Sequence, residues 1–137
     1  MDELGRNNKG TGAGPAVSLR NLVYAWDGRE PLLDIGKFDI GVGESLFIRG
    51  ASGSGKSTLL GLLGGVLTPT SGSVTVLGRD VGGMKSGARD RFRADHFGII
   101  FQMFNLLPYL SVIENTLLPC RFSSRRRQNA IDAGGER

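Results

Sequence analysis

Alternating apolar and polar residues predict short strands in the first third of the chain. Residues 17–26 (VSLRNLVYAW) alternate well enough for an edge strand. Residues 37–44 (KFDIGVGE) and 45–50 (SLFIRG) favour two more strands, interrupted by Gly41 and Gly43. We therefore expect three strands before the first helix.

A helix and a further strand follow. Residues 57–67 (STLLGLLGGVL) favour a helix over their first two turns. Residues 68–72 (TPTSG) contain a proline and a glycine, which end a helix and form a turn. Residues 73–78 (SVTVLG) predict a short strand that places Val74 and Val76 on one face.

Three more elements are expected in the second half of the chain. Alternating charges in residues 86–95 favour a short, exposed helix. Residues 97–101 (FGIIF) form a continuous apolar run of strand length, which is typical of a strand buried in a sheet. Ser111 and Glu114 have the spacing of a capping box, so we expect a helix to begin there and to stop at Pro119.

Composition bounds the kind of protein. Glycine occupies 22 of 137 positions, well above the usual share of about 7%. With 39% hydrophobic residues the bulk of the chain can bury a core, which excludes intrinsic disorder there. Residues 1–16 are poor in apolar groups and rich in turn formers, so we expect a disordered leader. The length allows one domain or a piece of a larger one.

Cysteine, histidine and apolar run lengths indicate a cytoplasmic location. Cys120 is the single cysteine and cannot close an internal disulfide. With His96 as the single histidine, the sequence has no Cys/His cluster of the kind that binds zinc. The longest apolar stretch, residues 59–67, is far shorter than the roughly 20 residues that cross a bilayer.

The net charge of +4 is concentrated at the C-terminal end. Residues 119–137 carry five basic and two acidic side chains. The three arginines at 125–127 could bind phosphate or an acidic lipid surface, although a solvated helix or loop face is the simpler interpretation. We expect no nucleic-acid partner.

The strongest motif is a phosphate-binding loop. Residues 50–57 match G-x-x-x-x-G-K-[ST], the Walker A pattern, where a predicted strand runs into a predicted helix. Successive backbone N–H groups at a helix N-terminus form a concavity that binds anions. The candidate nucleotide-binding residues are Gly50, Ala51, Ser52, Gly53, Ser54, Gly55, Lys56, Ser57 and Thr58.

The residue types in this loop fit a nucleoside triphosphate. Glycine is needed at Gly53 and Gly55 because a Cβ would obstruct the turn or the approach of the phosphate. Lys56 supplies charge to the β and γ phosphates. The Ser57 hydroxyl suits Mg²⁺, and the Thr58 hydroxyl can hydrogen-bond the next phosphate. From these residues alone, ATP and GTP both remain open.

Two motifs in the right order resemble the nucleotide-binding domain of ABC transporters. The first is GASGSGKST at residues 50–58 with LLGLLGG and TPTSGSV after it. The second, FGIIFQMFNLLPYLSVIENTLLP at residues 97–119, is similar to the family's Q-loop segment. The sequence of this segment most resembles the lipoprotein-release and macrolide-export subfamily. The resemblance to the family covers about residues 17–119.

The resemblance implies an α/β P-loop fold of ABC type that is incomplete in this chain. Residues 45–49 and 97–101 would begin a parallel core sheet. Residues 17–49 and 73–77 would form an antiparallel β subdomain beside it.

The resemblance also implies roles for residues outside the loop. Gln102 would contact Mg²⁺ or the attacking water and sense the membrane partner, so Lys56 and Gln102 are the expected catalytic residues, and Ser57 and Gln102 the expected metal ligands. Residues 102–110 would face a transmembrane permease subunit. Trp26, with Tyr24 as the alternative, would stack on adenine; a large π-face suits any planar base.

Other family motifs are absent from the sequence. It contains no run of four apolar residues followed by Asp-Glu, no LSGGQ signature and no histidine after Gln102. We therefore expect residues 17–118 to be the N-terminal part of an ABC ATPase domain. Residues 119–137 would be a basic tail, either the start of a helical subdomain or a non-native end.

The sequence thus predicts an ATP-binding, energy-coupling subunit of an ABC transporter for export or lipoprotein release. It would bind ATP and Mg²⁺, pair with a second ATP-binding protomer, and lie at the cytoplasmic face of the cell membrane. Two alternatives remain. One is a catalytically inactive nucleotide-binding fragment. The other is a P-loop kinase for a small molecule, for which Arg89, Arg91 and Arg93 are the candidate acceptor site.

Overall fold

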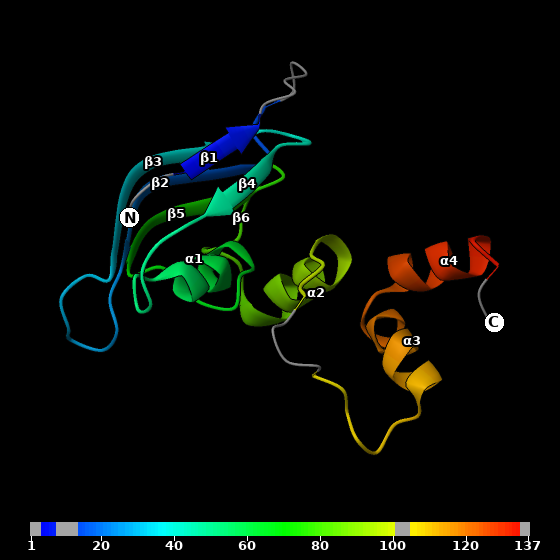
Figure 1. Ribbon diagram of the computed structural model, residues 1–137. Helices are drawn as coiled ribbons and strands as arrows, with labels where there is room; N and C mark the ends of the chain where they lie inside the picture. Colours follow the sequence, from blue (N-terminus) through cyan, green and yellow to red (C-terminus); the bar gives the residue numbers. More distant parts are fainter. Residues whose placement is uncertain (1–3, 8–13, 101–104, 135–137) are drawn as a thin grey trace. The chain divides into compact units, whose positions relative to one another are not determined.

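The computed structural model describes residues 4–7, 14–100 and 105–134 (Figure 1). The chain divides into two compact units, residues 1–84 and residues 85–137. Each unit is described by itself below.

In its described residues, unit 1 combines short strands with one helix. A four-stranded antiparallel sheet has the order β3-β2-β5-β6, and β1 pairs with β4 in a separate antiparallel ribbon. The elements are β1 (Leu4–Asn7), β2 (Val17–Tyr24), β3 (Leu33–Ile40), β4 (Ser45–Ile48), α1 (Lys56–Leu63), β5 (Ser71–Val76) and β6 (Arg79–Asp80).

Strand β2 is the centre of the larger sheet and not an edge strand, contrary to the prediction. It pairs with β3 on one side and β5 on the other, and the pairing with β5 shifts register between Arg20 and Val23. Asn21 adopts a left-handed conformation at this bulge (φ 47°). The extra residue lets both Leu19 and Leu22, three positions apart, become fully buried. Simple alternation would have sent one of them to solvent.

Gly72 on β5 packs against this bulge. Its φ of +81° lies in the left-handed region that favours glycine. A Cβ built at Gly72 would lie 2.1 Å from the carbonyl oxygen of Asn21. The backbone at the bulge can therefore come this close to β5 only because position 72 has no side chain.

The core of unit 1 lies between the larger sheet and α1. Val74 and Val76 are both buried on one face of β5, as predicted. The other buried apolar residues of this unit are Leu19, Leu22, Tyr24, Leu33, Phe38, Leu59, Leu62, Leu63 and Val81. Helix α1 ends after two turns at Gly64, which agrees with the prediction.

The described strands all pair antiparallel and all belong to unit 1, so neither unit by itself contains the predicted parallel sheet. Strand β4 pairs with Leu4–Asn7, a segment that we expected to be disordered, and none of the β4 residues is buried. Residues 97–100 have no regular secondary structure, and Ile100 is fully exposed. A strand with two apolar faces needs neighbouring strands and layers on both faces, and the described elements of unit 2 are helices that supply no neighbouring strand.

The described residues of unit 2 form three helices: α2 (Ser86–His96), α3 (Val112–Phe122) and α4 (Ser124–Asp132). Helix α2 agrees with the predicted exposed helix, and Phe92 is its buried residue. No helix in the described part of the chain is both long and apolar enough to cross a membrane.

Helix α3 begins as the capping box predicts. The Glu114 N–H donates to the Ser111 hydroxyl (3.2 Å), and the Glu114 carboxylate accepts from the Ser111 N–H (2.8 Å). The sequence predicts that this helix stops at Pro119, but it continues to Phe122. Proline removes one donor in the helix and need not end it when the following turn is held by other contacts. Here Ser123 directly caps α4 by accepting from the Arg126 N–H.

Helix α4 is anchored to the C-terminal end of α2, within the segment that we expected to be a basic tail. The Ser123 hydroxyl donates to the Asp95 carboxylate (2.5 Å). The Arg126 guanidinium donates to the carbonyl oxygens of Ala94 and Phe97. A cation at these carbonyls complements the negative end of the α2 dipole.

We predict that Gly72→Ala destabilises unit 1 strongly. The new Cβ would collide with the Asn21 backbone, so we expect the free energy of unfolding to fall by about 2 kcal/mol or more. Urea unfolding followed by Trp26 fluorescence measures this. Gly78→Ala is the matched control, because Gly78 also has a positive φ (75°) but open space around its Cβ position. Equal losses in the two variants would contradict the packing argument.

We predict a pH dependence of the α3 cap. The Glu114 carboxylate accepts hydrogen bonds from the N–H and from the hydroxyl of Ser111. These bonds, the N–H bond above all, lower the pKa of Glu114 from its usual 4.5. The charged carboxylate therefore supports the folded cap above the unfolded pKa, and this support is lost as the pH falls through the lowered value. The Ser111 amide signal in ¹⁵N NMR should titrate with a midpoint below 4.5. Ser111→Ala should move the midpoint of Glu114 upward, and an unchanged midpoint would argue against the box.

Candidate functional site

The phosphate-binding motif forms a loop between β4 and α1, as its sequence context predicts. Residues 49–55 lie between the two elements, and the Ser54 N–H donates to the Ala51 carbonyl (3.3 Å) to close a turn. Gly53 and Gly55 have φ values of 81° and 89°. Gly55 is the N-cap of α1, and its carbonyl accepts from the Leu59 N–H (2.8 Å). The helix therefore begins directly after the last residue of the loop.

The three glycines of the loop serve different purposes. At Gly53 a Cβ would meet open space, so its positive φ is the requirement. At Gly55 a Cβ would lie 2.7 Å from Cδ2 of Leu33. At Gly50 it would lie 2.6 Å from the Ser54 hydroxyl. The obstruction expected at Gly55 thus comes from the start of β3, which packs on the loop.

The Lys56 ammonium group is held at the loop. Its Nζ donates to the carbonyl oxygens of Gly50 (2.8 Å) and Ala51 (2.7 Å), and it lies 3.5 Å from the Ser54 hydroxyl. The side chain therefore folds back along the loop and does not extend into solvent. This places a positive charge beside the N-terminal end of α1.

The first turn of α1 is open to an anion. No side chain caps it, and no acidic residue lies in it. Its leading N–H groups therefore keep their capacity to donate, and the helix dipole adds positive potential there. Ser57 is exposed, whereas Thr58 is only 9% exposed. Of the two hydroxyl residues, Ser57 is the more accessible to a metal ion or phosphate.

This arrangement fits a nucleoside triphosphate with Mg²⁺. Open N–H groups, a nearby ammonium group and an uncapped helix terminus form the kind of concavity that binds phosphates. The exposed Ser57 hydroxyl supplies one oxygen of the type that Mg²⁺ prefers. Gln102, the other expected metal and catalytic residue, lies outside the described residues.

The two candidate base-stacking aromatics have different environments. Trp26 is 48% exposed, whereas Tyr24 is 7% exposed. Their ring centroids are 5.2 Å apart, and the ring planes are nearly perpendicular at 87°. A buried ring has no face to offer a ligand, so the geometry favours Trp26 over Tyr24 as the ring that a base could reach.

The expected partner-facing loop is described from Asn105 onward. Leu106 is 63% exposed and Tyr109 is 78% exposed. The Asn115 side chain accepts from the Leu107 N–H (2.8 Å) and donates to the Leu107 and Leu110 carbonyls (3.1 and 3.0 Å). This amide holds the loop against α3, so its apolar side chains are presented on an ordered backbone.

The three arginines that a kinase would need do not share one face of α2. Arg91 lies two positions from Arg89 and from Arg93 and faces another direction, whereas Arg89 and Arg93, four positions apart, lie on the same side. Arg93 pairs with Asp90 (2.8 Å) on its own helix.

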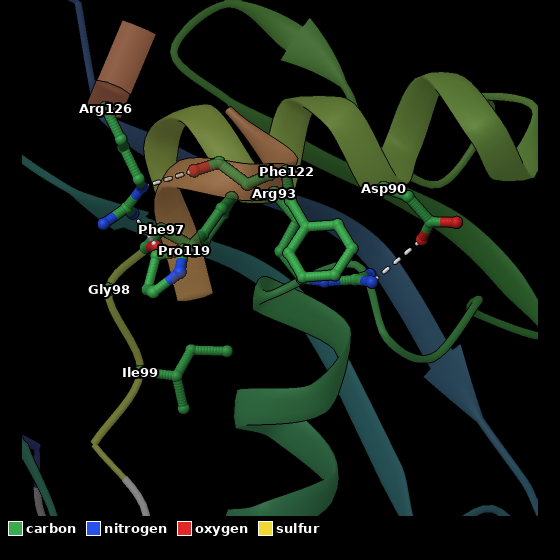
Figure 2. Close-up of a pocket in the computed structure, with 9 residues that line it drawn as sticks. Asp90, Arg93, Phe97, Gly98, Ile99, Pro119, Phe122 and Arg126 are labelled. Atoms are coloured by element: carbon green, nitrogen blue, oxygen red, sulfur yellow. Dashed lines mark hydrogen bonds and ion pairs between the residues drawn. The ribbon is translucent and has the colours of Figure 1, made fainter. Parts of the chain in front are cut away.

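One groove of unit 2 is an apolar cavity of about 670 Å³ (Figure 2). Its guanidinium groups, from Arg93 and Arg126, already bond protein oxygens, as the dashed lines in Figure 2 show. It therefore offers no phosphate site comparable to that of unit 1.

Sequence reasoning missed the residues that hold the aromatic pair in place. Leu33, which is 3% exposed, is the cross-strand partner of Tyr24 and also the neighbour of Gly55. The Thr70 hydroxyl accepts from the Ala25 N–H (3.1 Å), although TPTSG was expected only to form a turn. The pairing of the two strands could have indicated Leu33, but no local pattern marks Thr70.

Known proteins similar to this chain are ATP-binding components. An ATP-binding protein of an uncharacterized ABC transporter from Mycobacterium tuberculosis is 44% identical over 108 residues, which cover 77% of this chain and 44% of that protein. The lipoprotein-releasing system ATP-binding protein LolD of Xanthomonas campestris is 41% identical over 97 residues (71% of this chain, 41% of LolD). The macrolide export ATP-binding/permease protein MacB of Burkholderia pseudomallei is 39% identical over 125 residues (86% of this chain, 19% of MacB).

A solved structure and a family model agree with these relatives. The dimeric structure of the ATP-binding cassette MJ0796 bound to ADP and Pi matches with a TM-score of 0.64 and 28% identity, over 85% of this chain and 54% of that one. The chain spans less than half the length of the curated relatives named above. The ABC transporter family model matches residues 33–136, well over half of the chain. The chain therefore belongs to the ABC transporter family, of which it carries part of an ATP-binding domain of α/β fold.

Proposed function

We propose that this chain binds ATP with Mg²⁺ at residues 50–58 and acts as the energy-coupling part of an ABC transporter. The observation that carries the proposal is the Lys56 ammonium group held beside an uncapped helix N-terminus with no acidic residue. A triphosphate supplies the negative charge that this site lacks. The kinase alternative has less support, because Arg91 faces away from Arg89 and Arg93, and Arg93 is paired with Asp90.

Each residue of the proposed site has a distinct role. The loop N–H groups and Lys56 bind the β and γ phosphates, and the Ser57 hydroxyl ligates Mg²⁺. Trp26 stacks on the adenine through its exposed face. Gln102 is assigned to the metal or to the attacking water by its resemblance to the family's Q-loop glutamine. When bound, Mg²⁺ would neutralise charge between the β and γ phosphates.

The proposed partner surface is residues 102–110, which would contact a transmembrane permease subunit. Exposed Leu106 and Tyr109 support this, because an ordered loop that presents large apolar side chains needs a covering surface. The proposed location is the cytoplasmic face of the cell membrane. A second ATP-binding protomer is the other proposed partner, supported by the dimeric solved structure. The names of LolD and MacB favour lipoprotein release or export.

The 137-residue chain by itself should bind ATP without turning it over. Its sequence holds no apolar run followed by Asp-Glu, so it offers no carboxylate pair for Mg²⁺ and water after the phosphate loop. Nucleotide binding and hydrolysis are therefore separate tests of this chain.

We predict that Lys56→Ala weakens MgATP binding at least about tenfold, because a charge-assisted contact to phosphate is lost. Isothermal titration calorimetry on the purified chain measures the dissociation constant. Lys37→Ala is the matched control, since Lys37 is an exposed lysine of β3 in the same unit. Unchanged binding in Lys56→Ala would refute the phosphate-loop assignment. If the wild-type chain hydrolyses ATP and Lys56→Ala abolishes this turnover, only the expectation that the chain binds ATP without hydrolysing it would be refuted.

We predict that Ser57→Ala removes most of the contribution of Mg²⁺ to ATP affinity. Binding should be compared with Mg²⁺ and with EDTA. The wild-type chain should bind more tightly with Mg²⁺, whereas the variant should bind about equally under both conditions, because one metal ligand is gone. Ser52→Ala, another exposed serine of the loop, is the control and should keep the Mg²⁺ effect. A full Mg²⁺ effect in Ser57→Ala would exclude Ser57 as a ligand.

A further inference from the structure

Trp26 lies in a closed loop at the end of the β2–β3 hairpin. The Leu32 N–H donates to the Tyr24 carbonyl (2.8 Å), which closes the loop at its base. Within it, the Arg29 N–H donates to the Trp26 carbonyl (2.8 Å), and Gly28 takes a positive φ (66°). The Ala25 N–H is fixed to the Thr70 hydroxyl. The backbone around the indole is therefore well defined, although half of the side chain is exposed.

Among the described residues, the aromatic neighbour of the indole is the buried ring of Tyr24. The Tyr24 ring lies nearly perpendicular to the Trp26 ring, at 5.2 Å between centroids. This is the geometry that aromatic pairs prefer. Because Tyr24 is buried, its ring is itself fixed by packing and can serve as a support. The exposed 48% of Trp26 leaves room for a planar ligand.

Tyr24 is also linked to the phosphate loop. Its cross-strand partner is Leu33, and directly opposed residues on one sheet face have Cβ atoms about 5 Å apart. Leu33 in turn packs closely on Gly55, where an added Cβ would lie 2.7 Å from Cδ2 of Leu33. Gly55, Leu33, Tyr24 and Trp26 thus form a continuous series of neighbours that joins the phosphate end of the site to its aromatic end.

We propose that Tyr24 is a positioning residue that orients Trp26 for the nucleobase while the phosphate loop binds the triphosphate. This rests on the proposed function, in which residues 50–58 bind phosphate and Trp26 stacks on adenine. A free indole must lose rotational freedom when it stacks, and this opposes binding. The Tyr24 ring restricts the indole before the nucleotide arrives. Tyr24 therefore contributes to the affinity for the base and not to the affinity for phosphate.

The test compares ATP with inorganic tripolyphosphate, which has the phosphates but no base. Dissociation constants are measured by calorimetry on the full 137-residue chain. Binding of ATP is also followed by the fluorescence of Trp26, which is the single tryptophan of the sequence. The variants are Tyr24→Leu and Tyr24→Met, which keep an apolar side chain, and Tyr24→Phe, which keeps the ring. Trp26→Ala and Lys56→Ala are the reference variants.

We expect Tyr24→Leu and Tyr24→Met to weaken ATP binding about three- to tenfold, the range expected for loss of an aromatic pair. Tripolyphosphate binding should not change, and Tyr24→Phe should bind both ligands like the wild type. A general loss of structure would instead weaken both ligands together, and such a result in both Tyr24→Leu and Tyr24→Met overturns the inference. Trp26→Ala should lose the preference for ATP completely.

The remaining outcomes separate the inference from the proposed function. If Trp26→Ala weakens ATP binding and neither Tyr24→Leu nor Tyr24→Met does, the positioning role of Tyr24 is wrong and base stacking stands. If Trp26→Ala leaves ATP binding unchanged, base stacking and the positioning role both fail. If Lys56→Ala leaves both ligands unaffected, the phosphate loop itself is wrongly assigned and the inference fails with it.

Discussion

The packing of Leu33 against Gly55 is the constraint on which the arrangement of unit 1 depends. One residue without a side chain allows the first residue of β3 to touch the phosphate loop. That contact fixes where the β2–β3 hairpin lies relative to α1, and the hairpin carries both aromatic residues. A Cβ at position 55 would lie 2.7 Å from Cδ2 of Leu33, so the Leu33 side chain would have to move, and the positive φ of Gly55 would be strained as well.

A second constraint lies in the sheet itself. The bulge at Asn21 brings Leu19 and Leu22 to the same core, and Gly72 leaves space for the displaced backbone. Because β2 is central, an error in its register would affect β3 and β5 together. The glycine content of the chain is therefore partly structural, since Gly72 and Gly55 each permit a close approach that no other residue allows.

The sequence predicts local features of this protein well and long-range pairing poorly. The capping box of Ser111 and Glu114, the face of Val74 and Val76, and the strand–loop–helix context of Lys56 are all encoded within a few residues. The central place of β2 depends on β5, which lies about fifty residues later, and one extra residue at Asn21 hides the alternation. The apolar run at 97–101 predicts a strand, but residues 97–100 form none, because a strand also needs partner strands and the described elements of unit 2 are helices. The role of Leu33 was hidden for the same reason, because its contact with Gly55 crosses more than twenty positions.

The ribbon of β1 and β4 leaves apolar residues exposed, which affects how the chain associates in solution. Phe47 on β4 is 69% exposed and none of the β4 residues is buried, while Ile100 is fully exposed. Apolar strand-forming segments of this kind promote edge-to-edge association between molecules. The solubility of the isolated chain should therefore depend on protein concentration more steeply than that of a protein with a fully covered sheet.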